Sequence, residues 1–383
     1  METMVHVHVC LISEQLIPNL IPLLYEKPSM AVLLATDATV NRAQWLADIL
    51  RPRGIKSEIQ KISAYDFFQV SVVIKQIIER FSGQARLTLN VTGGTKIAAL
   101  AAFQEFYFAD HRIIYQDTYN DRLLELGDHL RETPLSKNFI GVKEYLACYG
   151  KKMTNKGQPS PLFEQRRDCL QKLCRFLVNN ERLLGRFNYA IDKYWNDRNG
   201  HAAIPVRELG DLADRLCTIL EKCNTATCSG EYLYIPDEDK KFFCHGGWLE
   251  EYVYRAVRGL NLKGLKVMIN VCVKWAKDRT TGVDVTNEFD VLFTWRNRLH
   301  IISCKTSNMD VRTNGSGTKG KEAVYELDSL ADDTGGLFGK AMLVSARKLS
   351  PYSLARASEN KIKVVDGKKV LRLTEILKGW INE

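Results

Sequence analysis

The stretch LNVTGGTKIAALAAFQ, residues 89–104, runs from an apolar strand pattern through two glycines directly into an apolar helix pattern. Glycine reaches positive φ without steric cost and lets a ligand approach the backbone, so Gly93 and Gly94 predict a tight, accessible turn. The amides that begin the helix near Thr95, together with the helix dipole, favour a negative group there. The stretch therefore predicts a strand–turn–helix unit with an anion site at its turn.

The side chains around the glycines support this interpretation but do not match a nucleotide-hydrolysing loop. Thr92 and Thr95 add hydroxyl donors, and Lys96 adds a positive charge. The glycine spacing is neither that of a Walker P-loop nor GxGxxG, which disfavours a nucleoside triphosphatase. The alternative is an ordinary structural turn with Lys96 in solvent.

Strand and helix patterns alternate on both sides of this stretch, over residues 5–126. The strand-like runs are VHVHVCLI, AVLLAT, IKSEIQKI, RLTLNV and RIIYQD, and the helix patterns include NRAQWLADIL and FFQVSVVIKQIIERF. Such alternation is typical of right-handed crossovers and a parallel sheet covered on both faces. Residues 1–135 are therefore predicted to form a doubly wound, Rossmann-like α/β domain. Ligands of such domains bind beyond the carboxyl ends of the strands, which the loop ATDATVNRAQ, residues 35–44, also reaches.

The composition of the 383 residues is that of a globular chain with room for two or three domains. A formal net charge of +9 favours an anionic partner, with nucleic acid or nucleotide first. No apolar run reaches the roughly 20 residues of a membrane span, and METMVHVHVC lacks the features of a secretion signal. We therefore expect a cytoplasmic protein that does not enter a membrane, with its ten cysteines as reduced thiols.

The rest of the chain predicts a connector, residues 136–240, and a mixed α/β domain, residues 241–383. The connector is either winged-helix-like or a small helical domain, and the second is favoured because no basic stripe marks a recognition helix. From Gly246 onward the pattern gives a helix, three consecutive strands, a loop rich in Gly, Asn and Ser, a helix and a strand. These elements predict a second α/β sheet.

Charged side chains interrupt two neighbouring strands of that second sheet. In NEFDVLF the side chains alternate, so Glu288 and Asp290 share one face, and in LHIISCKTS Ser303 and Lys305 do the same. A charge in the middle of an apolar strand is costly to bury unless it is paired or binds a metal ion. The pattern therefore predicts either a structural ion pair between Asp290 and Lys305 or a catalytic site.

The N-terminal part resembles a CARF domain, the sensor of cyclic oligoadenylate messengers in type III CRISPR defence. The resemblance rests on NxTGGTK after the fourth strand and on the Thr/Asp-containing loop after the second. It implies a cyclic oligoadenylate ligand, with cyclic tetra-adenylate first among the rings, and a homodimer that holds one ring across its two-fold axis. The expected ligand-binding residues, including one that ends the fifth strand, are Thr36, Asp37, Thr39, Asn41, Thr92, Gly93, Gly94, Thr95, Lys96 and Gln116.

The C-terminal strands resemble the PD-(D/E)xK nuclease core, in which an acid on one strand is followed on the next by an acid, one residue and a lysine. The resemblance implies a restriction-endonuclease-like domain in which Asp290 helps to hold Mn²⁺ or Mg²⁺ and Lys305 orients or deprotonates the attacking water. Ser303 stands where the family has the second acid, which leaves Glu288 or Glu250 to replace it.

The same family places an acid on the helix before these strands. GGWLEEYVY supplies Glu250 and Glu251 there, and Glu250 is the preferred metal ligand, with Glu251 as the alternative. The expected catalytic residues are Asp290, Lys305, Ser303 and Glu250, and the expected metal ligands are Glu250, Asp290 and Glu288.

Together the two resemblances imply a metal-dependent endonuclease of type III CRISPR antiviral defence. A cyclic oligoadenylate bound to the sensor dimer would activate cleavage of DNA, RNA or both, with little sequence specificity. The alternative is a DNA-binding regulator that responds to cyclic oligoadenylate and has a degenerate nuclease domain, because Ser303 replaces an acid.

Overall fold

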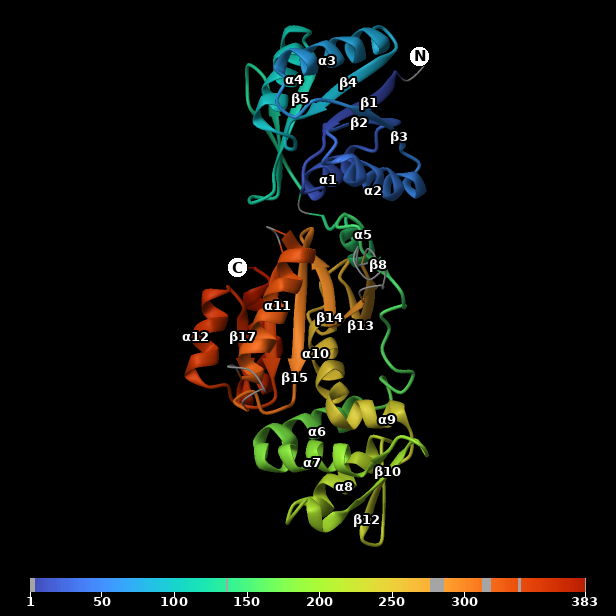
Figure 1. The fold of residues 1–383 in the computed structure, drawn as a ribbon, viewed down its shortest axis with the longest axis vertical. Coiled ribbons are helices and arrows are strands. Elements are labelled where there is room, and N and C mark those ends of the chain that lie inside the picture. The colour runs from blue at the N-terminus through green and yellow to red at the C-terminus, as the bar shows by residue number, and fades with distance from the viewer. Residues whose placement is uncertain (1–3, 136, 276–285, 312–317, 337–338, 383) are drawn as a thin grey trace. The chain divides into compact units, whose positions relative to one another are not determined.

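A computed structural model describes residues 4–135, 137–275, 286–311, 318–336 and 339–382 of the chain (Figure 1). The chain divides into two compact units. Unit 1 comprises Met1–Met153 and Lys274–Thr286, and unit 2 comprises Thr154–Val273 and Asn287–Glu383. Within the described ranges, no helix is both long enough and apolar enough to cross a membrane.

Unit 1 contains a seven-stranded sheet in the order β3-β2-β1-β4-β5-β6-β7. The strands are β1 Val5–Leu11, β2 Met30–Ala35, β3 Lys56–Lys61, β4 Ala85–Asn90, β5 Arg112–Asp117, β6 Arg122–Leu126 and β7 Arg131–Pro134. Strands β1 to β5 pair in parallel, while β6 and β7 add antiparallel hairpins at one edge. The predicted doubly wound α/β fold is confirmed, and the sheet contains two strands, β6 and β7, beyond the five strand runs predicted from the sequence.

Helices cover both faces of this sheet (Figure 1). They are α1 Ile17–Glu26, α2 Val40–Leu50, α3 Phe67–Phe81 and α4 Lys96–Phe108, and the short helices η1 Arg51–Arg53 and α5 Val142–Ala147 and strand β8 Lys152–Met153 complete the unit. Side chains alternate along β1, so Val7, Val9 and Leu11 are buried in one cluster with α3 and α4. The opposite face of β1 carries His6 and His8 and lies toward α1.

The first part of unit 2 packs three helices with a small antiparallel sheet. Its elements are α6 Arg167–Asn179, α7 Glu181–Tyr194, β9 Trp195–Asn196, β10 His201–Pro205, η2 Val206–Glu208, α8 Ala213–Lys222, β11 Thr227–Ser229, β12 Tyr232–Ile235 and α9 Glu238–Phe242. The strand order is β11-β12-β10-β9. The connector therefore has a four-stranded sheet that the favoured small-helical-domain prediction did not include.

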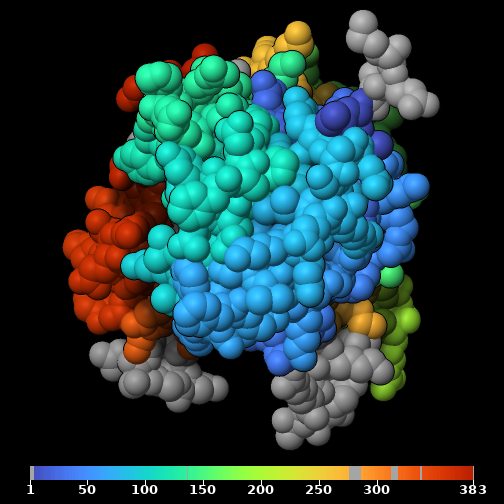
Figure 2. Space-filling view, turned by 90° about the horizontal axis from the view of Figure 1, so that it is seen from above, coloured from blue at the N-terminus to red at the C-terminus, as the bar shows by residue number. Residues whose placement is uncertain are grey.

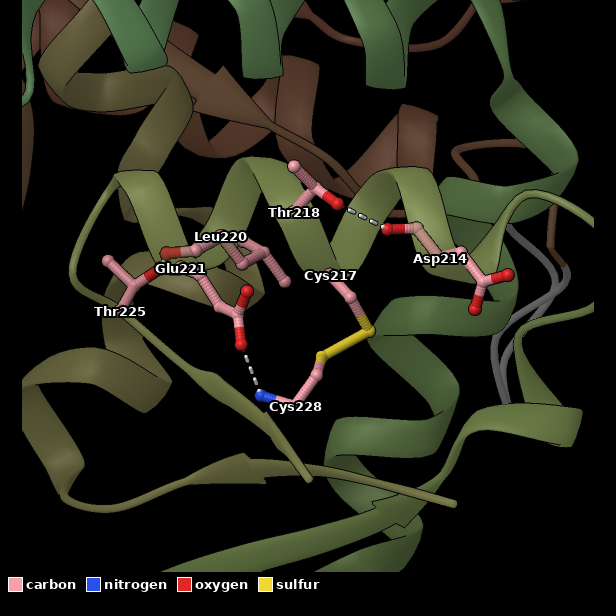
Figure 3. Close-up of a disulfide and its surroundings, with 7 residues drawn as sticks. All are labelled: Asp214, Cys217, Thr218, Leu220, Glu221, Thr225 and Cys228. Carbon is pink, nitrogen blue, oxygen red and sulfur yellow. Dashed lines mark hydrogen bonds between the residues drawn. A yellow bond between two sulfur atoms is a disulfide. The ribbon is translucent and has the colours of Figure 1, made fainter. Parts of the chain in front are cut away.

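A disulfide joins α8 to β11 in this part of the chain (Figure 3). It links Cys217 to Cys228, with their Cα atoms 6.0 Å apart and a sequence separation of 11 residues. The prediction that all ten cysteines are reduced thiols is therefore wrong for this pair, because the α8–β11 turn brings the two sulfur atoms together, a proximity that the spacing alone did not reveal.

The second part of unit 2 forms a mixed sheet in the order β17-β16-β15-β14-β13. Its elements are η3 Phe243–Gly247, α10 Trp248–Arg258, β13 Lys266–Lys274, β14 Thr286–Trp295, β15 Arg298–Lys305, α11 Lys319–Gly335, β16 Lys340–Ser345, α12 Pro351–Glu359, β17 Lys363–Asp366, η5 Gly367–Arg372 and α13 Leu373–Trp380. Strand β15 is antiparallel to β14 and parallel to β16. One face, with Val291, Phe293 and Ile302, is buried in a cluster that includes α10 residues Val253 and Val257.

Candidate functional site

The glycine turn follows β4 and begins α4, as the sequence predicts. Gly94 has a φ of +81°, in the left-handed region that favours glycine. Gly93 is not in that region. It is required by a close approach, because a Cβ there would lie 2.1 Å from the carbonyl oxygen of Leu11. The expectation of positive φ is therefore right for Gly94 and wrong for Gly93.

The hydroxyl of Thr92 holds the turn against the neighbouring strand end. Thr92 Oγ1 donates to Asn90 Oδ1 at 2.6 Å and accepts a hydrogen bond from the Gln116 backbone amide at 2.7 Å. Gln116 itself is buried, and its side-chain Oε1 has no hydrogen-bond partner within the described ranges. The end of β5 is thereby fixed beside the glycine turn, with one amide oxygen unsatisfied.

Thr95 and Lys96 open helix α4. Thr95 Oγ1 caps the helix by accepting from the Ala98 amide at 3.2 Å, and it also donates to the Ala64 carbonyl oxygen. Lys96 is exposed in the first turn of the helix. The threonine therefore stabilises the turn, while the lysine is free to meet an anion from solvent.

The loop after β2 carries the other predicted ligand-binding residues. Thr39 Oγ1 accepts from the Thr36 amide at 2.9 Å, which closes the loop before α2. Asp37 forms an exposed ion pair with Lys61, and Asn41 is exposed in the first turn of α2. All ten predicted ligand-binding residues thus lie at or just beyond the carboxyl ends of β2, β4 and β5, at one edge of the sheet.

Unit 1 also contains one compact group of histidines and a carboxylate. The ligand atoms of His6, His8 and Glu26 lie within 4.8 Å of one another. However, Arg112 Nη1 donates to Glu26 Oε2 at 2.9 Å, and Arg86 Nη2 lies 3.2 Å from His6 Nδ1. Two guanidinium groups therefore already supply positive charge, which makes this an internal polar network rather than a cation site.

In unit 2, the predicted catalytic residues line one cavity of about 240 Å³. They are Glu250, Glu288, Asp290, Ser303 and Lys305. A wider groove of about 740 Å³ is lined by two of these residues, Glu250 and Lys305. The structure therefore brings together the preferred residues of the second site, whereas Glu251, the alternative metal ligand, does not line this cavity.

Asp290 is oriented from the neighbouring strand. The register pairs Val291 with Ile302, which places Asp290 beside Ser303 at the end of the ladder. Asp290 Oδ2 accepts from Ser303 Oγ at 3.2 Å and from the Cys304 amide at 2.6 Å. Within the described ranges no ion pair joins Asp290 to Lys305, so the structural ion pair is not formed.

The carboxyl groups of the cavity repel one another. The pKa of Glu250 is raised to about 9, mainly by burial and also by the charges of Asp290 and Glu288, while the charge of Lys305 opposes this shift. Burial also raises the pKa of Asp290 and of Glu288. Keeping these groups ionised therefore requires more positive charge than Lys305 supplies, and carboxylate oxygens are the ligands that Mg²⁺ and Mn²⁺ prefer. The donor set therefore fits a divalent cation, although no three of these carboxylates lie within 4.8 Å of one another in the described structure.

The two acids at the start of α10 face different partners. Glu251 is buried and forms an ion pair with Arg166 at 3.1 Å, whereas Glu250 lines the cavity.

Thr306 holds the segment before α10 against the end of β15 through two hydrogen bonds. Its Oγ1 donates to the His245 carbonyl at 2.9 Å and accepts from Asn188 Nδ2 at 3.1 Å. These bonds position Glu250 near Lys305.

The sequence did not single out Glu326 of α11, which lines the same cavity. It is one acid among several on an amphipathic helix, and its only local signal is that it precedes Leu327, a buried residue. The wider groove also contains cationic and aromatic residues that the sequence did not point to. These are Lys241, Lys319, Arg347, Tyr189 and Phe242.

Comparisons with known proteins give one family match in each of the two regions that contain the candidate sites. Residues 7–145 match the family model of the Card1 CARF domain, and residues 237–383 match that of the Card1-like endonuclease domain. No curated protein matches the sequence.

Solved structures resemble the chain over nearly its whole length. Can2 from Sulfobacillus thermosulfidooxidans, in complex with cyclic tetra-adenylate, is 28% identical, with 99% of this chain and 100% of that chain covered and a TM-score of 0.77. Protein VC1899 from Vibrio cholerae shares the fold at 23% identity, with 98% of each chain covered and a TM-score of 0.85. A type III CRISPR defence DNA nuclease activated by cyclic oligoadenylate shares the fold at 17% identity, with 91% of this chain and 47% of that chain covered and a TM-score of 0.56.

Proposed function

Because the chain joins a Card1 CARF domain to a Card1-like endonuclease domain, we propose that it is a metal-dependent endonuclease of type III CRISPR defence that cyclic oligoadenylate activates. The observation that carries the proposal is the cavity shared by Glu250, Asp290 and Lys305. Acids and a lysine around one space are what metal-assisted phosphodiester hydrolysis requires.

Cyclic tetra-adenylate is the proposed activator. The similar Can2 structure contains this ring, and the sheet edge of unit 1 offers suitable groups for it. The start of α4 supplies backbone amides and Lys96 for phosphates, and the unsatisfied Gln116 Oε1 can accept a hydrogen bond from an adenine amino group.

We also propose that the sensor is a homodimer. Helices α3 and α4 pack against each other on the face of unit 1 seen in Figure 2, and both helices carry large apolar side chains that are exposed. The exposed apolar residues of these two helices are Phe68, Val72, Ile97, Leu100, Tyr107 and Phe108. An exposed apolar patch of this kind indicates an interaction surface, and a symmetric pair suits a ring of even symmetry. Light scattering of the wild type and of Leu100→Glu tests this, because the charge is expected to shift the protein to monomers.

In the proposed reaction, Asp290, Glu250 and Glu288 supply oxygen ligands for Mn²⁺ or Mg²⁺. The bound ion would polarise the scissile phosphate and lower the pKa of a water molecule. Lys305, on the same face as Ser303, orients that water and stabilises the negative charge that develops on the phosphate. Ser303 acts as a positioning residue, because its hydroxyl donates to Asp290.

The substrate is proposed to be DNA, RNA or both. The groove beside the cavity combines lysines and an arginine for phosphates with Tyr189, an exposed ring on which a base can stack. Neither kind of contact reads base identity, so cleavage with little sequence preference is expected. Binding should weaken steeply as salt increases.

Activation is proposed to be allosteric. The ring site lies in unit 1 and the cavity in unit 2, so the ring can act only by binding more tightly to the state in which the nuclease is competent.

The test incubates the protein with cyclic tetra- or hexa-adenylate, Mn²⁺ or Mg²⁺, and a supercoiled plasmid, single-stranded DNA or RNA. Cleavage that requires both ring and metal, and that Lys305→Ala abolishes while ring binding persists, supports the proposal. No cleavage of any substrate, together with a gel shift of a labelled duplex, would instead identify the regulator described above.

A further inference from the structure

Ser303 stands where the nuclease pattern has an acid, so one side of the cavity has no charged oxygen donor. Asp290 and Glu288 both belong to β14, and Glu250 comes from the start of α10. Strand β15 contributes the Ser303 hydroxyl, which donates a hydrogen bond to Asp290 Oδ2. It also contributes Lys305, whose charge repels a cation. A divalent ion held between β14 and β15 therefore lacks a carboxylate from the β15 side.

Helix α11 crosses this side of the sheet and carries a carboxylate into the cavity. Ala323, Leu327 and Leu330 follow one another at helical spacing, and the first two are buried. Leu327 and Leu330 line the cavity together with Ile301 of β15, so they fix the helix over that strand. Glu326 lines the same cavity and is close enough to Asp290 to act on its charge.

We propose that Glu326 supplies the carboxylate that Ser303 cannot, so that the metal ligands come from α11 as well as from β14 and α10. This inference rests on the proposed nuclease function. It explains how a chain with serine at the usual acid position keeps a full set of hard oxygen donors. The side chain of Glu326 is exposed, but it is long and flexible and can turn toward the cavity when a cation is bound there.

Glu288 does not fill the same place. It lies on the strand that already provides Asp290, two residues away, and so adds charge on the β14 side. Glu326 lines the cavity from the helix that follows β15 in the chain, and Ser303, at the position of the missing acid, lines the same cavity. The two acids are therefore not interchangeable, and Glu288 should not compensate the loss of Mn²⁺ affinity in Glu326→Gln.

The experiment measures Mn²⁺ binding to the full chain by titration calorimetry, independently of cleavage. Glu326→Gln is compared with Glu322→Gln, which removes an exposed acid one turn earlier on α11 that does not line the cavity. We expect Glu326→Gln to weaken Mn²⁺ binding at least ~10-fold, as loss of groups around metal ions does, and Glu322→Gln to bind like the wild type. In the double variant Ser303→Glu/Glu326→Gln, an acid at the usual position should restore most of the affinity. Thermal melts confirm that each variant folds.

The outcomes separate the inference from the proposed function. Equal Mn²⁺ affinity in Glu326→Gln and Glu322→Gln would overturn the inference, while ring-dependent cleavage by the same preparations would leave the function standing. Weaker Mn²⁺ binding in Glu326→Gln, with no cleavage by the wild type, would support the ligand assignment and refute the nuclease. A wild type that binds no Mn²⁺ with or without the ring overturns both.

Discussion

The backbone amide of Cys304 donates a 2.6 Å hydrogen bond to Asp290 Oδ2, where the β14–β15 ladder ends. The amide thus bonds to a side chain of the neighbouring strand. The Ser303 hydroxyl donates to the same oxygen, so both hydrogen bonds that the Asp290 side chain accepts within the described ranges end on Oδ2. Oδ1 is therefore left for the cavity.

Ser303→Ala should impair the site without unfolding it. The variant loses one of the two hydrogen bonds that orient Asp290, while the Cys304 amide remains. We expect the Mn²⁺ affinity and the cleavage rate to fall roughly 10-fold, which is the smaller of the losses seen when a hydrogen-bond partner of a metal ligand is removed. Calorimetry and a cleavage assay measure both, with Ser329→Ala, exposed on α11, as the control. A Ser303→Ala protein that matches this control would show that the serine does not position Asp290.

Gly93→Ala should destabilise unit 1. The added Cβ would lie 2.1 Å from the Leu11 carbonyl oxygen and 3.1 Å from Asn19 Nδ2, and backbone atoms cannot move aside as a side-chain end can. We expect a loss of about 1–3 kcal/mol in the free energy of unfolding, typical of overpacking. Urea unfolding measures it against Gly127→Ala, where a Cβ meets open space. Similar stability in the two variants would mean that the turn can move away from β1.

The disulfide should stabilise the connector. It closes a loop over a separation of 11 residues, and bridges over such loops contribute about 2–4 kcal/mol. A reductant should therefore lower the urea midpoint of the wild type but not that of Cys217→Ser/Cys228→Ser. Equal midpoints of the wild type with and without reductant would contradict this.

Unit 1 should lose stability when the solution is acidified. Burial lowers the pKa of His6 from 6.5 to about 4, assisted by His8, Arg86 and Arg112 and opposed by Glu26. At a pH between these two pKa values, the unfolded chain binds more protons than the folded chain does. The free energy of unfolding therefore decreases as the pH falls through this range. Glu26, whose pKa is lowered to about 2, adds a further loss only below its ordinary value of 4.5.

Urea midpoints measured from pH 7 to pH 4 check this expectation. His6→Gln should show a shallower decrease over that range, because an amide does not titrate, while His129→Gln, exposed in the β6–β7 turn, should follow the wild type. The same slope in His6→Gln and the wild type would mean that another group controls the acid response.

Regular patterns made much of this structure predictable from the sequence. Alternation along β14 places Val291 and Phe293 in the core and Glu288 and Asp290 on the other face, as expected. Strand β7 was not predicted because its sequence, RETP, is short, polar and mostly exposed. Its pairing with β6 therefore produces no apolar pattern in the sequence.

The remaining features depend on contacts that no local pattern encodes. Gly93 and Gly94 are neighbours with the same expected role, yet one is required by an approach to Leu11 and the other by its own φ. Glu250 and Glu251 differ only in which side of α10 they occupy, and Arg166, far away in the sequence, is the partner of Glu251. Glu326 lines the cavity because α11 packs over β15, which depends on the arrangement of the whole sheet.

Thr306 connects helix α7 to the candidate site of unit 2. Its hydroxyl joins Asn188 of α7 to the segment that leads into α10, and it follows Lys305 directly in the chain. A displacement of α7 would therefore either move this strand end or break the hydrogen bond between Asn188 and Thr306. The position of the Lys305 ammonium is thus linked, through one hydroxyl, to that of a helix in the first part of unit 2.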